Sequence, residues 1–70
     1  MNSFDKTRIL VYKNGIPVGY VKSVSYKNGT FTIISDKMKA KTYSSVDYAQ
    51  RDIDTIVYTG LQQGYMFSLS

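Results

Sequence analysis

Few side chains in this sequence can do acid–base or metal chemistry. The chain contains no His and no Cys, so it lacks imidazole bases, thiol nucleophiles and the usual nitrogen and sulfur ligands of zinc. Three of its carboxylates fall on the polar side of a predicted helix, where solvated acids are common. The sequence therefore predicts no catalytic site, no metal site, no cofactor and no enzymatic activity. The full set of carboxylates is Asp5, Asp36, Asp47, Asp52 and Asp54.

The basic residues are unevenly distributed along the 70 residues. Eight lie in 1–43 against two acidic residues, whereas 44–70 contains one basic residue against three acidic ones. A basic sheet with Tyr and Phe among its lysines is typical of surfaces that meet a phosphate backbone. The alternative is that these lysines keep the protein soluble and block pairing of strand edges. The candidate nucleic-acid contacts are Arg8, Lys13, Lys22, Lys27, Lys37, Lys39 and Lys41.

Two Lys-Asn-Gly tripeptides, at 13–15 and 27–29, separate runs rich in Val, Ile, Thr, Tyr and Phe. Asn-Gly favours the type I′ turn of a two-residue hairpin, so we expect strands near 7–13, 17–26 and 30–35. That turn fixes the register: it places Val11 opposite Val18 and Val24 opposite Ile33. The face predicted to be buried is then Ile9, Val11, Val18, Tyr20, Val24, Tyr26, Phe31 and Ile33.

The spacing changes to a helical period after residue 44. Apolar residues recur every three or four positions, and Ser44-Ser45 supplies an N-cap, so we expect a helix near 45–59 that ends at Gly60 with Leu61 packing back. Asp47, Arg51, Asp52 and Asp54 fall on its polar side. The inward stripe is Val46, Ala49, Ile53, Ile56 and Val57.

The alternating residues of 64–69 predict a final strand. The fold class is thus α+β: a three-stranded antiparallel meander, one amphipathic helix on one face and a last strand that joins the sheet (β-β-β-α-β). The chain is expected to form a single small domain over 1–70. We expect the last strand to run parallel to the first and third strands, at either edge.

One helix can cover only one face of this sheet. The opposite face carries an apolar patch with polar surroundings, which is more typical of a protein-binding or dimer surface than of an inert face. The predicted anchors of this interface are Leu10, Tyr12, Val21 and Ile34.

The stretch 36–45, DKMKAKTYSS, is followed by Ala49, Ile53 and Gly64-Tyr65-Met66-Phe67. With the preceding meander, this pattern resembles small accessory proteins of bacteriophages and mobile elements. That resemblance implies a protein that binds, and in some cases inhibits, a host protein or defence complex in the bacterial cytoplasm. Asn14-Gly15, Tyr43-Ser44 and Ala49 are also similar to the arm-type DNA-binding N-terminal domain of tyrosine integrases, which implies at most a free-standing DNA binder.

The sequence contains no apolar segment of about 18 residues and no signal peptide, which predicts a cytoplasmic protein without membrane contact. The predicted function is a non-enzymatic module that binds a host protein and inhibits it. The alternative is a small DNA- or RNA-binding protein that uses its basic sheet. A homodimer formed through the open sheet face is a third outcome that the sequence leaves open.

Overall fold

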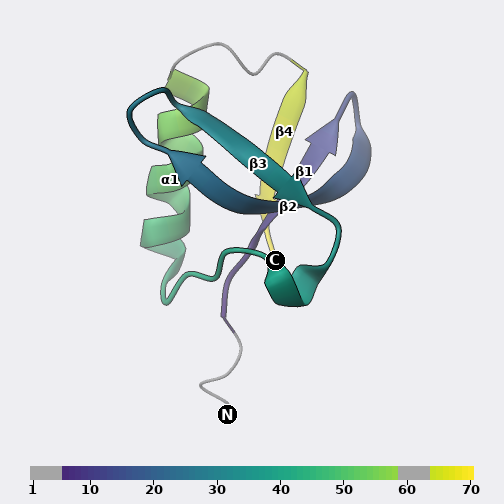
Figure 1. The fold of residues 1–70 in the computed structure, drawn as a ribbon, viewed down its shortest axis with the longest axis horizontal. Coiled ribbons are helices and arrows are strands. Elements are labelled where there is room, and N and C mark those ends of the chain that lie inside the picture. Colours follow the sequence, from purple (N-terminus) through teal and green to yellow (C-terminus); the bar gives the residue numbers. More distant parts are fainter. Residues whose placement is uncertain (1–5, 59–63) are drawn as a thin grey trace.

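The computed structural model describes residues 6–58 and 64–70. Its elements follow the predicted order: β1 (Ile9–Lys13), β2 (Ile16–Ser25), β3 (Thr30–Ile34), the short 3₁₀ helix η1 (Lys37–Lys39), α1 (Val46–Tyr58) and β4 (Tyr65–Leu69). The strands form one four-stranded sheet in the order β3-β2-β1-β4 (Figure 1). The α+β class with a helix packed on the sheet is confirmed. The predicted helix stop at Gly60 and Leu61 lies outside the described residues.

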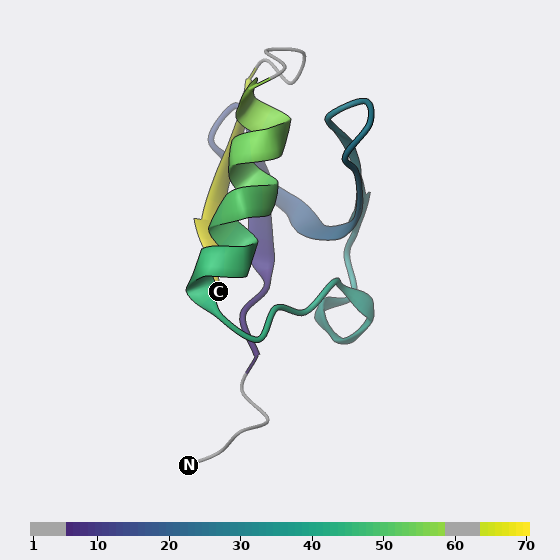
Figure 2. The ribbon, with the colours of Figure 1, turned by 90° about the vertical axis from the view of Figure 1, so that its left-hand side faces the viewer.

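The helix α1 covers only the part of the sheet formed by β1 and β4, and β2 and β3 curve away from that part (Figure 2). Its first turn is held by the Ser45 hydroxyl, which accepts a hydrogen bond from the Tyr48 amide at 3.4 Å. The core between helix and sheet is built on Ile9, Val11, Val21, Tyr43 and Ala49. Val24, Phe31, Ile53, Tyr65 and Phe67 pack against this core.

The first hairpin has the predicted turn but not the predicted register. Asn14 and Gly15 both have positive φ, at 53° and 84°, as a type I′ turn requires, and Lys13 pairs with Ile16. One extra residue, Val18, then bulges out of β2, so that Val11 pairs with Gly19. The predicted pair of Val11 with Val18 is therefore wrong.

The second hairpin also differs from its prediction. Ser25 pairs with Thr30, so a four-residue turn replaces the two-residue Asn-Gly turn, and the Gly29 amide donates to the Ser25 carbonyl at 2.7 Å. A second extra residue, Lys22, bulges between Val21 and Ser23. Val24 therefore pairs with Phe31 rather than with Ile33.

These two bulges change which residues of β2 face the core. Each bulge shifts the inward and outward alternation by one position. Val21, predicted on the open face, is fully buried in the core. Of the residues predicted inward, Ile9 and Val11 are buried and Val24 and Phe31 pack on the core, whereas Val18, Tyr26 and Ile33 are exposed and Tyr20 lies on the opposite face.

The last strand is antiparallel to its neighbour, so the prediction of a parallel strand is wrong. Before α1 begins, the chain returns to the start of β1, where Thr7 and Tyr43 form an isolated antiparallel bridge. The helix α1 therefore runs in the same direction as β1, and β4 must come back along β1 in the opposite direction. Leu10 pairs with Ser68, and Tyr12 pairs with Met66.

Candidate functional site

Three of the four residues predicted to form an interface lie on the sheet face where the sequence placed them. Leu10, Tyr12 and Ile34 are half-buried on the sheet face that α1 leaves uncovered, whereas Val21 belongs to the core and cannot contact a partner. The reason is the bulge at Val18, which turns Val21 inward and brings Tyr20 outward in its place. The anchor set therefore loses one member and gains another.

Strand pairing aligns these residues in a row. Leu10 pairs with Tyr20, and Tyr20 pairs with Ile34, so three strands contribute one apolar side chain each. Met66, paired with Tyr12, extends the patch onto β4 with 63% of its surface exposed. We call this surface, formed by Leu10, Tyr12, Tyr20, Ile34 and Met66, the outer face. The alternation of β4 in the sequence was the available signal for Met66. Pro17 and Gly19, which interrupt the strand pattern on either side of Val18, were the available signal for the bulge that brings Tyr20 outward.

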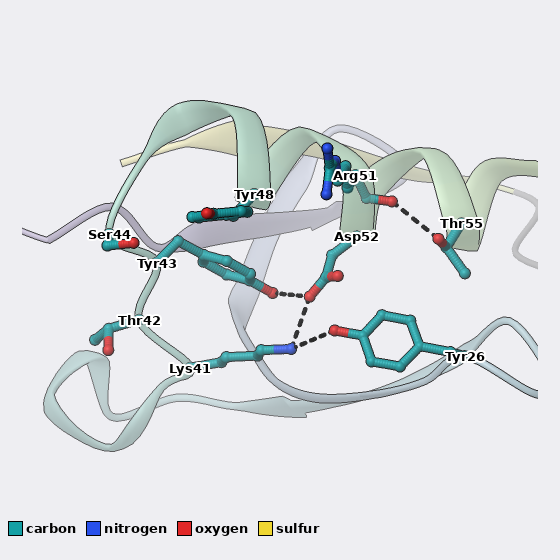
Figure 3. Close-up of a pocket in the computed structure, with 9 residues that line it drawn as sticks. All are labelled: Tyr26, Lys41, Thr42, Tyr43, Ser44, Tyr48, Arg51, Asp52 and Thr55. Atoms are coloured by element: carbon teal, nitrogen blue, oxygen red, sulfur yellow. Dashed lines mark hydrogen bonds and ion pairs between the residues drawn. The ribbon is translucent and has the colours of Figure 1, made fainter.

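A second surface feature lies between α1 and the tip of the β2–β3 hairpin, and we call it the tyrosine cleft. It has a volume of about 530 Å³. Figure 3 shows that its side chains come from the hairpin, from the segment before α1 and from α1 itself. The lining residues are Tyr26, Lys41, Thr42, Tyr43, Ser44, Tyr48, Arg51, Asp52 and Thr55.

A charged cluster occupies the floor of the tyrosine cleft (Figure 3). The Lys41 ammonium lies 2.8 Å from Oδ2 of Asp52 and donates to the Tyr26 hydroxyl at 2.7 Å. The Tyr43 hydroxyl donates to the same oxygen of Asp52. Asp52 is only 4% exposed, so the prediction that it lies on the solvated side of α1 is wrong. The cluster joins three separate segments of the chain at one carboxylate.

The environment of this cluster favours the ordinary charge state of each group. Burial alone would raise the pKa of Asp52, but hydrogen bonds from Lys41 and Tyr43 outweigh burial, and the pKa is lowered. Burial opposes the charge of Lys41, yet its bonds to Asp52 and Tyr26 give a raised pKa. Burial, and then the hydrogen bond to Asp52, raise the pKa of Tyr43. Each shift moves a pKa away from neutrality, whereas a general acid or base needs a pKa near the working pH.

The residues predicted to contact nucleic acid fall into two groups: some make contacts within the protein, and the others are exposed. Lys41 is held by Asp52, the Arg8 guanidinium donates to the Lys37 carbonyl at 2.8 Å, and the Lys13 ammonium lies 4.2 Å from the centre of the Tyr65 ring. The remaining lysines are exposed on separate elements: the second bulge of β2, the β2–β3 turn and η1. They are Lys22, Lys27, Lys37 and Lys39.

Comparisons with protein-family models, with curated proteins and with solved structures find no match. Within residues 6–58 and 64–70, no helix is long and apolar enough to cross a membrane. The same residues contain no group of three acidic, His or Cys side chains placed to hold a metal ion. Function is therefore inferred from the geometry of the outer face and of the tyrosine cleft.

Proposed function

We propose that this protein is a non-enzymatic binding module whose outer face docks a partner protein. The observation that carries the proposal is the apolar row of Leu10, Tyr20 and Ile34, which crosses three strands on the side opposite α1. Contiguous apolar surface of this kind is uncommon on an inert monomer face. Tyr12 and Tyr20 add aromatic contact area at a low cost in side-chain entropy.

The tyrosine cleft supports the non-enzymatic part of the proposal. Its one buried carboxylate, Asp52, is already satisfied by Lys41 and Tyr43, so it has no free role as a base. The cluster instead fixes the hairpin tip and the segment before α1 to the helix. This connection stabilises the curvature of the sheet, and the curvature presents the outer face.

The partner we propose is a protein of a bacterial host, in line with the resemblance to phage accessory proteins. Binding across an apolar sheet face would block the surface that it covers, which is how a module without catalytic groups can inhibit. The exposed lysines around the sheet add positive charge, which speeds association with an acidic partner.

The test is a quantitative capture experiment with tagged protein in bacterial lysate, run in parallel with and without nuclease. We expect the wild type to retain one protein at a stoichiometric level, and the variants Tyr12→Ala and Ile34→Asp to retain less than about a tenth of it, because central anchors cost more than 1.4 kcal/mol when lost. The matched control is Met38→Ser, which changes an apolar side chain that is 80% exposed on η1. Circular dichroism of each variant verifies the fold.

Two outcomes would contradict the proposal. One is equal capture by the wild type, by Tyr12→Ala and by Ile34→Asp. The other is capture of DNA or RNA that is lost with nuclease and weakens steeply between about 50 and 200 mM salt, as release of counterions requires. That second result would favour nucleic-acid binding by Lys22, Lys27, Lys37 and Lys39.

A further inference from the structure

The outer edge of β4 is an unprotected strand edge. Among residues 6–58 and 64–70, the strand pairs with β1 alone, and none of its residues from Tyr65 to Leu69 is charged or proline. Natural sheets usually protect such an edge with a charge, a proline, a bulge or a covering element. Figure 2 shows β4 at the margin of the molecule, with no other described element beyond it. An edge of this kind is able to pair with another strand.

The hydrogen bonds to β1 show which backbone groups of β4 point outward. The Ser70 and Arg8 amides each donate to the other residue's carbonyl at 2.8 Å, and the Asn14 amide donates to the Gly64 carbonyl at 2.9 Å. In an antiparallel ladder, the backbone groups of every second residue bond to the same neighbouring strand. The amides and carbonyls of the even-numbered residues of β4 therefore point toward β1. The amides and carbonyls of Tyr65, Phe67 and Leu69 therefore face the open edge.

The flank of α1 on the same side is also uncharged and mainly apolar. Tyr48, Arg51, Asp52 and Thr55 line the tyrosine cleft and so define one flank of the helix. At 100° per residue, the opposite flank carries Val46, Gln50, Ile53 and Val57. The cleft lies on the side of α1 toward the β2–β3 hairpin, so this flank lies on the other side of the helix, toward β4. Val46 is 54% exposed and Val57 is 59% exposed. The sequence predicts these two valines to face inward, and in the single chain they do not.

We propose that the protein forms a homodimer in which β4 pairs antiparallel with β4 of a second copy. The outward groups fix the register: Phe67 meets Phe67 of the second copy at a two-fold axis, and Tyr65 meets Leu69, since only this alignment pairs all the outward residues. The axis is perpendicular to the sheet, so both α1 helices lie on one face, with their Val46 and Val57 flanks turned toward each other. The result is a continuous eight-stranded sheet, twice the four strands of one chain.

A second copy fits this edge better than an unrelated strand. The residues of β4 and of the facing helix flank carry no charge of their own, so the repulsion expected between two chains of net charge +4 is weakest where these surfaces meet. The same contact also covers Val46 and Val57, which a single extended peptide added to the edge would leave exposed. This inference stands apart from the proposed partner site, because the outer face stays open in the dimer.

The test uses purified protein alone, in sedimentation equilibrium over a range of concentrations. We expect a species of twice the chain mass of 7.9 kDa. The two helices run antiparallel across the axis, so Val57→Lys places an unpaired ammonium against the apolar Val46 end of the second copy, and it should raise the dissociation constant more than about tenfold. The matched control is Tyr58→Lys, which adds the same charge at the next position, where 91% of the side chain is exposed. Tyr12→Ala should leave the dimer intact, which separates this interface from the outer face.

Amide hydrogen exchange identifies the interface independently of the valines. In the single chain, the Phe67 and Leu69 amides have no partner across the edge within the part of the chain that the structure describes, and we expect them to exchange faster than those of Met66 and Ser68. In the proposed dimer, protection of Phe67 and Leu69 rises with protein concentration. A monomer at millimolar concentration would overturn the proposal, as would a dimer that resists Val57→Lys and leaves the Phe67 amide unprotected.

Discussion

Asp52→Ala is expected to lower the free energy of unfolding by about 3 kcal/mol at pH 7, because it leaves Lys41 and Tyr43 without their shared partner in a partly buried site. For a chain of this length, the total free energy of unfolding is roughly 4–10 kcal/mol. The loss is therefore a large fraction of the total. Unfolding in urea, followed by circular dichroism, measures it.

Asp54→Ala is the matched control for this experiment. Asp54 lies on the same helix, but it is exposed, and its oxygen accepts a hydrogen bond from Gln50 at 2.9 Å. We expect its loss to change the free energy of unfolding by less than about 0.5 kcal/mol. Equal effects of the two substitutions would show that the cluster at Asp52 does not hold the fold together.

The pH dependence distinguishes loss of the charged interaction from loss of packing. The pKa of Asp52 in the folded protein is lowered from its ordinary value of 3.8, so between these two pKa values the unfolded chain binds more protons than the folded one. The stabilisation is present above the unfolded pKa and is lost as the pH falls through the folded pKa. The difference in free energy of unfolding between the Asp54→Ala and Asp52→Ala variants should therefore shrink as the pH falls from 5 to about 2. A difference that stays constant over this range would assign the effect to packing.

Gly19→Ala is expected to lower the free energy of unfolding by about 3 kcal/mol, from backbone strain and a steric clash together. Gly19 has a φ of 147°, and a Cβ at this position would lie 2.7 Å from Cγ2 of Ile33 and from the carbonyl oxygen of Ile34. The second contact is with backbone, which cannot move away without disturbing β3. The substitution therefore acts directly on the bulge that places Val21 inward.

Gly15→Ala is the control for strain without a clash. Gly15 also has a positive φ, at 84°, but a Cβ there meets nothing within 4 Å. Its expected cost is about 1 kcal/mol from strain alone. Thermal and urea unfolding of the two variants give the comparison, and an equal loss in both would mean that the close approach of β2 to β3 at Gly19 is unimportant.

The hairpins and the helix could be predicted from the sequence because their signals are local. Asn14-Gly15 determines its own turn, and the spacing of Ala49, Ile53 and Ile56 defines a helix that buries them or packs them on the core. The two bulges differ in this respect. Pro17 and Gly19 interrupt the strand pattern on either side of Val18, and a glycine or proline inside a strand is a local signal of a bulge. The bulge at Lys22 has no such signal, and it is favoured only once Val21 and Val24 can both pack on the same core.

The direction of β4 and the burial of Asp52 depend on contacts between distant segments. The pairing of Thr7 with Tyr43 places the first turn of α1 beside the start of β1, and no residue near Thr7 or Tyr43 indicates this pairing in the sequence. Asp52, in contrast, had a signal that was available. It stands three residues after Ala49 and four before Ile56, on the margin of the inward stripe, where a buried acid needs partners such as Lys41 and Tyr43.

The central claim is that the outer face, rather than the tyrosine cleft, contacts a partner protein. Photo-cross-linking tests it most directly, with benzoylphenylalanine incorporated in place of Tyr12 in one sample and in place of Tyr48 in another. Tyr48 lines the cleft and is exposed, so it serves as the matched position. After irradiation in bacterial lysate, we predict a discrete protein adduct from position 12 and none from position 48. Adducts from position 48 alone, or from position 12 only to nucleic acid or to the protein itself, would contradict the account.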